Sequence, residues 1–357
     1  MIRAIAAAVF ALGLGLLPGL LASAPSHAAD AAANSAVIIM YHRFGEDKYP
    51  STNITLAQID DHISELTGGQ YTVWPIKRIV ETMRAGQPLP ARTIGISIDD
   101  GFVSVAAEAW PRFKKAGLPF TLFTATDYHA QPIRGYLTWD QIREMAKDPL
   151  VDFGHHSASH LHMPDATVEA NRAEIEKAFK VWEEKIGRRP VLFAYPFGEA
   201  SGQAIAAARD AGFIAAFGQH SGAIGPEMAK SDTERFYLPR FAFNENWGEA
   251  KRFRQAINTV ALPLAEITPA DPLVAQPNPP AFGFTLARPV PGIERIVCHS
   301  SHEGVGKIER LGETRVEARF TQPFPKGRTR INCTLPAPKD MGEGRWFWFG
   351  RQFYVRG

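Results

Sequence analysis

Short apolar runs alternate with helical segments from residue 36 to residue 262, and this alternation constrains the fold more than any other feature of the chain. The clearest run, residues 93–99, is rich in β-branched side chains and ends at Asp99-Asp100-Gly101, as expected for a buried strand that ends in a turn. Further strands are expected at residues 37–41, 71–74, 120–124, 151–154, 191–194, 214–217 and 237–241. Seven or eight such units with short connections predict a parallel sheet that is closed, or nearly closed, into a (β/α) barrel.

The helices between these strands carry their own boundary signals. Thr55 with Gln58, and Thr138 with Gln141, have the spacing of a capping box, and Gly187 is placed to end a long amphipathic helix. Helices are expected at residues 55–66, 76–84, 106–115, 138–147, 167–186, 201–211 and 247–262. We expect His62 to lie on the surface of the first of them.

Polar side chains follow the expected strands at the points where the strands end. They are His42, Asp99-Asp100, the segment from His156 to His160, the segment from Tyr195 to Gly198, and Gln219-His220. In α/β folds the carboxyl ends of parallel strands face one ligand-binding rim. The sequence therefore predicts that these residues converge on one site.

Two histidines and a carboxylate at this rim suggest a metal site. His156 and His160 are four residues apart, and Asp100 follows another strand. This set matches a catalytic zinc site with an open position, and also the facial triad of non-haem iron enzymes. Zinc generates a nucleophile from water near neutral pH, and the adjacent Asp99 is free to move a proton. Taken alone, Asp-Asp-Gly is equally typical of an Asx-type turn.

The motifs resemble those of a known family. Ser97-Ile98-Asp99-Asp100-Gly101 is similar to T-F-D-D-G, and His156-Ser157-Ala158-Ser159-His160 to H-S/T-x-x-H, of the polysaccharide deacetylases, the NodB-homology or family-four carbohydrate esterase group. The resemblance covers residues 36–262. It implies a distorted (β/α) barrel that removes N-acetyl or O-acetyl groups from sugars with a divalent metal, usually zinc.

The resemblance also implies roles for the motif residues. Asp100, His156 and His160 would hold the metal, which we expect to be Zn²⁺ or another divalent ion such as Co²⁺, Ni²⁺ or Fe²⁺. Asp99 would be the general base that takes a proton from the attacking water.

The third family motif, R-x-P-Y-G, is only partly present. Tyr195-Pro196-Phe197-Gly198 resembles it, and Tyr195 and Phe197 are the expected oxyanion and substrate residues. A backbone N–H near Phe197 would stabilise the oxyanion even with Phe in place of Tyr. The family's arginine falls on Ala194, and Arg240 is a candidate to replace it.

The general acid is less evident. The family's last motif is an apolar strand that ends in Leu-x-His, and residues 238–241, near the end of the expected barrel, contain no histidine. Residues 37–42 have that shape instead, an order that resembles the circularly permuted subgroup containing the exported poly-β-1,6-N-acetylglucosamine deacetylases. We expect His42 to be the general acid. The alternative is that His42 only caps the end of its strand, and His220 is then the rival candidate for the acid.

The N-terminus resembles an export signal. Arg3 precedes an apolar stretch at residues 4–21, and small residues follow at 22–29, so residues 1–28 are expected to be a cleaved signal peptide. The alternative is an uncleaved anchor, which would be the chain's only link to a membrane. The formal net charge of +2 gives no indication of nucleic-acid binding. We therefore expect an exported protein of the periplasm or the extracellular space.

The composition changes after Leu262. Eight prolines between residues 263 and 291 predict a semi-rigid linker, and the alternating pattern of residues 292–357 predicts a small all-β module. In an oxidising compartment, the two cysteines, Cys298 and Cys333, are expected to form a disulfide.

The resulting hypothesis is an exported, metal-dependent deacetylase that hydrolyses N-acetyl groups. Its substrate would be an N-acetylated polysaccharide or oligosaccharide containing N-acetylglucosamine, such as poly-N-acetylglucosamine, peptidoglycan or a chitin-like polymer. The alternative is a catalytically weak or inactive glycan-binding barrel that serves envelope polysaccharide export. A non-haem iron oxygenase shares the triad but fits the βα alternation poorly.

Overall fold

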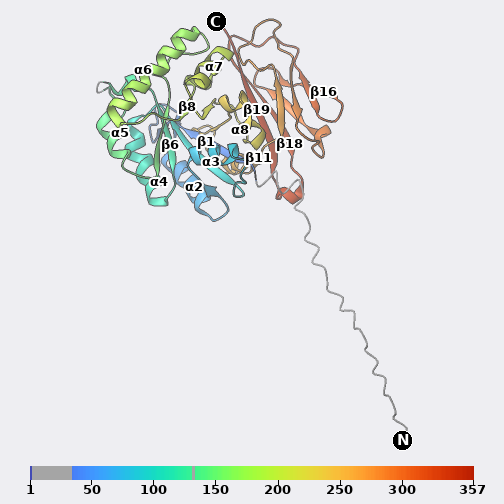
Figure 1. Ribbon diagram of the computed structural model, residues 1–357, viewed down its shortest axis with the longest axis horizontal. Coiled ribbons are helices and arrows are strands. Elements are labelled where there is room, and N and C mark those ends of the chain that lie inside the picture. Colours follow the sequence, from blue (N-terminus) through green and yellow to red (C-terminus); the bar gives the residue numbers. More distant parts are fainter. Residues whose placement is uncertain (2–33, 131–132) are drawn as a thin grey trace.

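A computed structural model describes residue 1 and residues 34–130 and 133–357 of the chain. Apart from Met1, the signal peptide expected at residues 1–28 lies outside the described residues. The chain forms an α/β barrel followed by an all-β module, which lie side by side in Figure 1. The fold class expected from the sequence is confirmed.

The barrel is built on a parallel sheet with the strand order β10-β1-β5-β6-β7-β8-β9, and β4 pairs with β5. The strands are β1 (Ala36–Tyr41), β4 (Thr72–Val73), β5 (Thr93–Asp99), β6 (Phe120–Thr124), β7 (Val151–His155), β8 (Leu192–Ala194), β9 (Ala215–Phe217) and β10 (Phe241–Ala242). Leu238 forms a parallel bridge with Phe217 of β9, and Phe241 pairs with Ile39 of β1. The segment around β10 therefore closes the gap between the first and last strands.

Helices cover the outside of the barrel (Figure 1). They are α2 (Leu56–Thr67), α3 (Ile76–Arg84), α4 (Trp110–Ala116), α5 (Trp139–Met145), α6 (Val168–Ile186), α7 (Gly202–Asp210), α8 (Pro226–Lys230) and α9 (Ala250–Ile257). Shorter elements are β2 (Arg43–Phe44), β3 (Asn53–Ile54), η1 (Val105–Ala109), η2 (Thr126–His129), η3 (Pro196–Gly198), η4 (Glu234–Phe236), η5 (Ile293–Arg295) and η6 (Lys339–Met341). Both predicted capping boxes are present. Across residues 34–130 and 133–357, no helix combines the length and apolar character that a bilayer crossing requires.

The position expected for His62 is wrong. Its side chain is buried between α2 and α9, where it stacks on Phe253 with ring centroids 3.7 Å apart. The Tyr41 hydroxyl donates to Nδ1 at 2.9 Å, and Nε2 donates to the Gly248 carbonyl at 2.9 Å. These two hydrogen bonds offset the cost of burying a polar ring.

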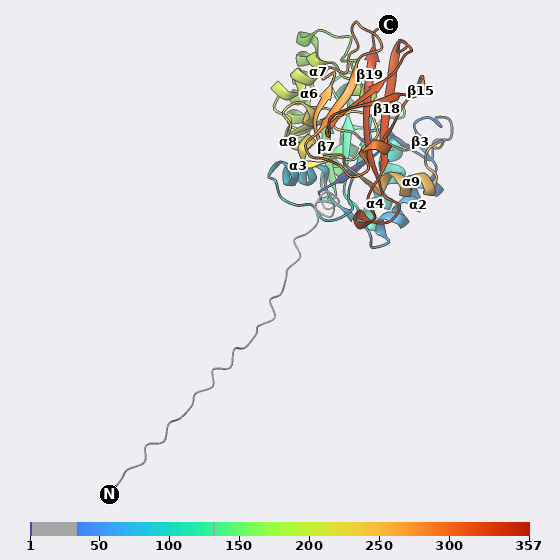
Figure 2. The same cartoon turned by 90° about the vertical axis from the view of Figure 1, so that its right-hand side faces the viewer.

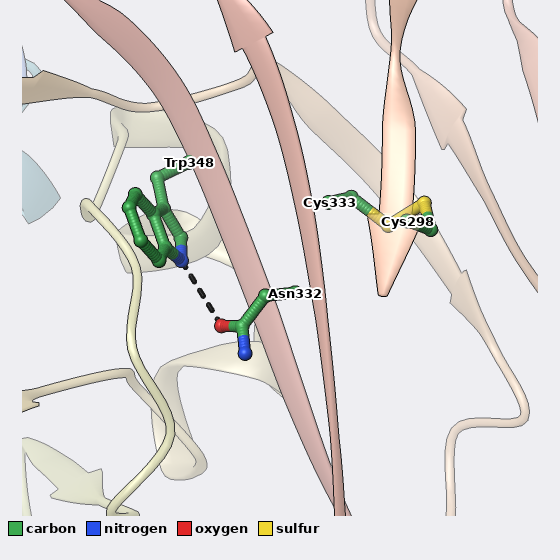
Figure 3. Close-up of a disulfide and its surroundings, with 4 residues drawn as sticks. All are labelled: Cys298, Asn332, Cys333 and Trp348. Carbon is green, nitrogen blue, oxygen red and sulfur yellow. Dashed lines mark hydrogen bonds between the residues drawn. A yellow bond between two sulfur atoms is a disulfide. The ribbon is translucent and has the colours of Figure 1, made fainter. Parts of the chain in front are cut away.

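The all-β module is a sandwich of two sheets. One has the order β11-β19-β18-β14-β15 and the other β12-β13-β17-β16. The strands are β11 (Thr259–Val260), β12 (Leu264–Thr268), β13 (Phe282–Leu286), β14 (Val297–Ser300), β15 (Gly304–Val305), β16 (Lys307–Leu311), β17 (Arg315–Arg319), β18 (Gly327–Pro336) and β19 (Trp346–Val355). Phe282 and Phe284 contact Phe349 between the sheets, with ring centroids 6.2 and 5.3 Å apart. Cys298 and Cys333 form the predicted disulfide, which joins β14 to β18 (Figure 3).

The segment before residue 292 differs from the expected linker. Residues 264–268 and 282–286 are the strands β12 and β13, and β13 pairs with β17 in the second sheet. Their flanking prolines lie outside the paired residues, where a missing N–H costs no ladder hydrogen bond. The last barrel helix also ends earlier than expected, at Ile257, because Thr259 and Val260 pair with β19.

The module packs tightly on the barrel. One cluster of buried apolar side chains runs from Ile38 and Phe123 in the barrel to Phe284 and Phe349 in the sandwich. The Ala223 N–H donates to the carbonyl of Trp348 in β19, at 3.1 Å. Figure 2 shows β18 and β19 running along this face of the barrel. The shared core fixes the position of β18 relative to the ends of the barrel strands.

Candidate active site

A cleft of about 580 Å³ lies where the barrel rim meets the module. Its floor includes His42, Asp100 and His160 from the barrel, and its wall includes Arg328, Arg330 and Asn332 from β18. We call the three residues of β18 the wall. The floor is the barrel side of the cleft: the three barrel residues, Phe197, and the buried residues behind them, Asp99, His156 and Arg240. The other lining residues are Met40, Ser51, Thr52, Phe197, Gln219, Ser221, Ala242, Phe243, Asn244, Trp247 and Arg252.

The turn after β5 presents Asp100 to this cleft. Asp100 and Gly101 both have positive φ values, 72° and 75°. A Cβ on Gly101 would lie 2.6 Å from the Thr124 hydroxyl oxygen, so only glycine fits. The Thr124 hydroxyl donates to the Asp100 carbonyl at 3.0 Å. The turn is thus held from below by β6.

Asp100, His156 and His160 come together as the sequence predicts. The Nε2 atoms of both histidines lie 3.4 Å from the same Asp100 oxygen, Oδ1, and one ligand atom from each residue falls within 4.8 Å of the others. Two ligands about 2.1 Å from a tetrahedral zinc ion are about 3.4 Å apart. The spacing therefore fits a divalent metal better than direct hydrogen bonds.

The protonation of His156 supports the same conclusion. Its Nδ1 donates to the carbonyl of Ala194 at 2.7 Å, which leaves Nε2 with a lone pair. Nε2 is buried and has no hydrogen-bond partner among the described residues. A carbonyl behind a histidine is the usual support of a metal ligand. The three residues thus fit a metal ion.

Backbone strain is concentrated around these ligands. Of the five described non-glycine residues with positive φ, four lie here: Asp100, Ser157, His160 and Phe197. Such conformations cost about 1–3 kcal/mol each and persist only where packing enforces them. The Phe197 ring packs edge-on against His160, with centroids 4.5 Å apart. The strain thus serves to aim the ligands into one small volume.

Asp99 lies behind the candidate metal ligands and is paired with Arg240. The guanidinium donates two hydrogen bonds to its carboxylate, at 2.6 and 2.8 Å, and a third to the Gly218 carbonyl at 2.9 Å. Both side chains are fully buried. Burial raises the pKa of Asp99, but Arg240 and then His156 outweigh it and hold the pKa below its usual value. Arg240 therefore occupies the position beside Asp99 that Ala194 cannot fill.

The two histidines considered as acids lie in different places. His42 follows β1 and lines the cleft. Burial lowers the pKa of His42, and Asp100 and Asp99 act in the opposite direction. His220 is buried away from the cleft against Tyr237, with ring centroids 4.7 Å apart. Burial and then Arg351 lower the pKa of His220. Its position outside the cleft lining argues against the role of acid.

The third motif forms a tight turn at η3. Phe197 lines the cleft and is 41 % exposed, whereas Tyr195 is buried and its hydroxyl donates to the Phe236 carbonyl at 2.9 Å. The Tyr195 side chain therefore anchors the turn and does not reach the cleft. Gln352 of β19 donates to the Gly198 carbonyl at 2.8 Å, so the module also supports this turn.

Several cleft residues were not identified from the sequence. Trp247, 51 % exposed, and Arg252 line the cleft from the loop after β10 and from α9, and the Arg252 guanidinium lies 4.4 Å from the Trp247 ring centroid. The wall residues lie in β18, where buried and partly exposed side chains alternate strictly and so identify the two faces of the strand. Nothing in the alternation indicates that the partly exposed face meets the barrel.

Known proteins resemble this chain in sequence and fold. The polysaccharide deacetylase family model matches residues 86–216. A putative polysaccharide deacetylase, YxkH, from Bacillus subtilis is 22% identical over 176 residues, which cover 49% of this chain and 61% of YxkH. The poly-beta-1,6-N-acetyl-D-glucosamine N-deacetylase of Escherichia coli K12 is 22% identical over 269 residues, covering 64% of this chain and 39% of the relative. The chain thus spans less than two thirds of either protein's length.

The solved structure of Streptococcus pyogenes deacetylase PplD in complex with acetate has the same fold. Its TM-score is 0.56 at 16% identity, and the match covers 62% of this chain and 98% of that one. The family model, the relatives and the fold agree with the DDG and HSxxH motifs at the floor of the cleft. The barrel of this protein is a domain of the polysaccharide deacetylase family.

Proposed function

We propose that this protein removes N-acetyl groups from a glycan that contains N-acetylglucosamine, with a divalent metal held by Asp100, His156 and His160. The observation that carries the proposal is the buried Asp99–Arg240 pair directly behind the three ligands, at 2.6 Å. A carboxylate held ionised beside a metal site can accept a proton from water. The similarity to a poly-N-acetylglucosamine N-deacetylase supports the choice of substrate.

Each residue has a distinct role in the proposed reaction. A bound divalent ion, zinc or Co²⁺, Ni²⁺ or Fe²⁺, would polarise the acetyl carbonyl and acidify water. Asp99 takes a proton from the attacking water, and Arg240 fixes the orientation of its carboxylate. The Phe197 backbone N–H stabilises the oxyanion. His42 protonates the departing amine, and Asp100 and Asp99 offset part of the lowering of its pKa that burial causes.

The proposal includes export to the periplasm or beyond. The Cys298–Cys333 disulfide supports it, because such bonds persist in oxidising compartments. The alternative, a barrel that binds glycans without hydrolysing them, rests on the absence of the family's arginine, which falls on Ala194. Arg240 donates two hydrogen bonds to Asp99, so the expected base has an arginine partner without it.

The experiment measures acetate release from N-acetylglucosamine oligomers by the purified protein, after chelation and again after zinc is added. We expect release to stop with the chelator and to return with zinc. Oligomer binding without release in either state would instead support the non-catalytic barrel.

Two neighbouring substitutions test the division of roles. Asp100→Ala should lose both the metal and the activity, whereas Asp99→Asn should keep the metal and lose about 10²–10⁴-fold in kcat. Asp61→Asn, an exposed carboxylate on α2, is the matched control and should change neither. A near-normal rate for Asp99→Asn would exclude Asp99 as the base.

A further inference from the structure

The wall of the cleft consists of side chains from one face of β18. Arg328, Arg330 and Asn332 are partly exposed, whereas Thr329, Ile331 and Cys333 between them are buried. Figure 3 shows the alternation at its end: Asn332 points toward Trp348, and Cys333 points to the disulfide on the other side of the strand. Because successive side chains of a strand point to opposite faces, β18 offers every second residue to the cleft.

This wall is held rigidly against the floor. A Cβ on Gly350 of β19 would lie 2.0 Å from the carbonyl oxygen of Ser221, a cleft residue, so the two backbones are in contact. The Nε of Arg328 donates to Glu199, next to the third motif, at 2.7 Å. The wall therefore belongs to the same cavity as the metal ligands.

The cleft lining carries more arginines than carboxylates. Three arginines line it, Arg252, Arg328 and Arg330, and the one carboxylate among its lining residues is Asp100, a metal ligand. Arg328 is paired with Glu199. Arg330 donates to the uncharged Gln352 at 3.0 Å, Arg252 lies on the Trp247 ring, and neither forms an ion pair in the described part of the chain.

Arg330 is also held at an energetic cost. Burial, and then repulsion by Arg328, lower its pKa to about 10. A largely buried charge without an oppositely charged partner lowers stability unless a ligand compensates for it. A guanidinium presents a planar set of donors that matches a carboxylate.

We propose that Arg330 and Arg252 bind a carboxylate on the sugar next to the N-acetylated one, so that the cleft selects acidic N-acetylated glycans. This inference rests on the proposed function and narrows its substrate class. Neutral oligomers then occupy the floor without using the wall. Hydrogen bonds to charged groups contribute about 1.5–3 kcal/mol, which corresponds to about tenfold or more in affinity.

The test compares two probes that differ only in charge. One is a hexasaccharide of alternating glucuronate and N-acetylglucosamine, and the other is the same hexasaccharide with its carboxyl groups reduced to alcohols. We expect the acidic form to bind about tenfold tighter at low salt, with a preference that falls as salt is added. Equal binding of the two forms, or no binding of either, would overturn the inference.

Substitutions assign the preference to the two arginines. Arg330→Gln and Arg252→Gln should each bring the ratio of the two affinities toward one. Arg310→Gln, which removes the same charge from the exposed strand β16, should leave the ratio unchanged. A preference that survives in both cleft variants would overturn the assignment. Two variants guard against a folding defect in either one, and thermal unfolding checks each.

Binding and acetate release separate this inference from the proposed function. If zinc-loaded protein prefers the acidic form but releases acetate from no oligomer, the proposed function fails and the recognition site stands. If acetate is released from N-acetylglucosamine oligomers and the two hexasaccharides bind equally, the function stands and the inference fails.

Discussion

The floor and the wall of the cleft are built in opposite ways. The floor consists of turns at the ends of barrel strands, where Asp100, His160 and Phe197 adopt positive φ values near 60–72°. The wall is a regular strand of ten residues whose side chains face the cleft because of simple alternation. The proposed metal site therefore depends on strain enforced by packing, whereas the proposed recognition of a charge needs only a strand held in place.

The largest expected effect on stability is at the buried Asp99–Arg240 pair behind the cleft. Arg240→Met leaves the Asp99 carboxylate buried without a partner, which should lower the free energy of unfolding by about 3–5 kcal/mol. Chemical denaturation measures this change. Adding Asp99→Asn to Arg240→Met should recover part of the loss, since no unpaired charge then remains. A double variant that is no more stable than Arg240→Met would contradict this explanation.

Part of the floor could be predicted from its motifs, because these residues are close in sequence to the ends of their strands. Asp100 and His156 lie directly after strands, and His160 follows in the same loop as His156, so the parallel order of the sheet brings them together wherever the strands are identified. Arg240 was less certain, because its pairing with Asp99 spans 141 residues and depends on the segment that closes the barrel.

The wall could not be predicted in the same way. Alternation in β18 identifies a face but not its neighbour, and the contact between Arg328 and Glu199 joins residues 129 apart. The prolines of residues 263–291 also predict a linker, because a proline is equally compatible with the end of a strand and with a segment that has no strand. His62, by contrast, was predictable, since it follows Ile59 by three residues and precedes Leu66 by four, on the buried face of α2.

Acid should weaken the barrel through His62. Burial lowers the pKa of His62 to about 4 in the folded protein, against 6.5 as the ordinary value. The unfolded chain therefore binds the proton first, and this contribution to stability is complete above pH 6.5 and is lost between pH 6.5 and about 4. The loss amounts to about 3 kcal/mol.

Unfolding free energies measured from pH 7 to pH 4 check this dependence. His62→Gln should be less stable at pH 7, because the ring leaves its place between Tyr41 and Phe253. Its stability should fall less steeply with acid than that of the wild type. Equal slopes for the two proteins would show that another group carries the acid sensitivity.

A substitution at the contact between the module and the barrel tests whether the wall depends on its placement. Gly350→Ala adds a Cβ whose position in the structure is 2.0 Å from the Ser221 carbonyl oxygen, so β19 must move. We expect a loss of about 1–3 kcal/mol in unfolding free energy. The preference for the acidic hexasaccharide should also fall. Gly357→Ala, which meets no atom within 4 Å, is the control. An unchanged preference would mean that the arginines act without the close packing of the module.

The smallest effect separates stacking from charge recognition. Trp247 is exposed and lines the cleft, and an exposed ring there suits the apolar face of a sugar. Trp247→Ala should raise KM for neutral N-acetylglucosamine oligomers about fivefold, the equivalent of about 1 kcal/mol, and leave kcat unchanged. Trp247→Phe should restore most of the loss.

Tyr49→Ala is the matched control. Tyr49 is similarly exposed and also has a guanidinium 4.0 Å from its ring centroid, but it lies outside the cleft. The affinity ratio between acidic and reduced hexasaccharides should survive in Trp247→Ala, since both guanidinium groups, Arg330 and Arg252, remain in the chain. If that ratio collapses as well, Trp247 positions Arg252, and the aromatic ring and the cationic wall act as one recognition surface.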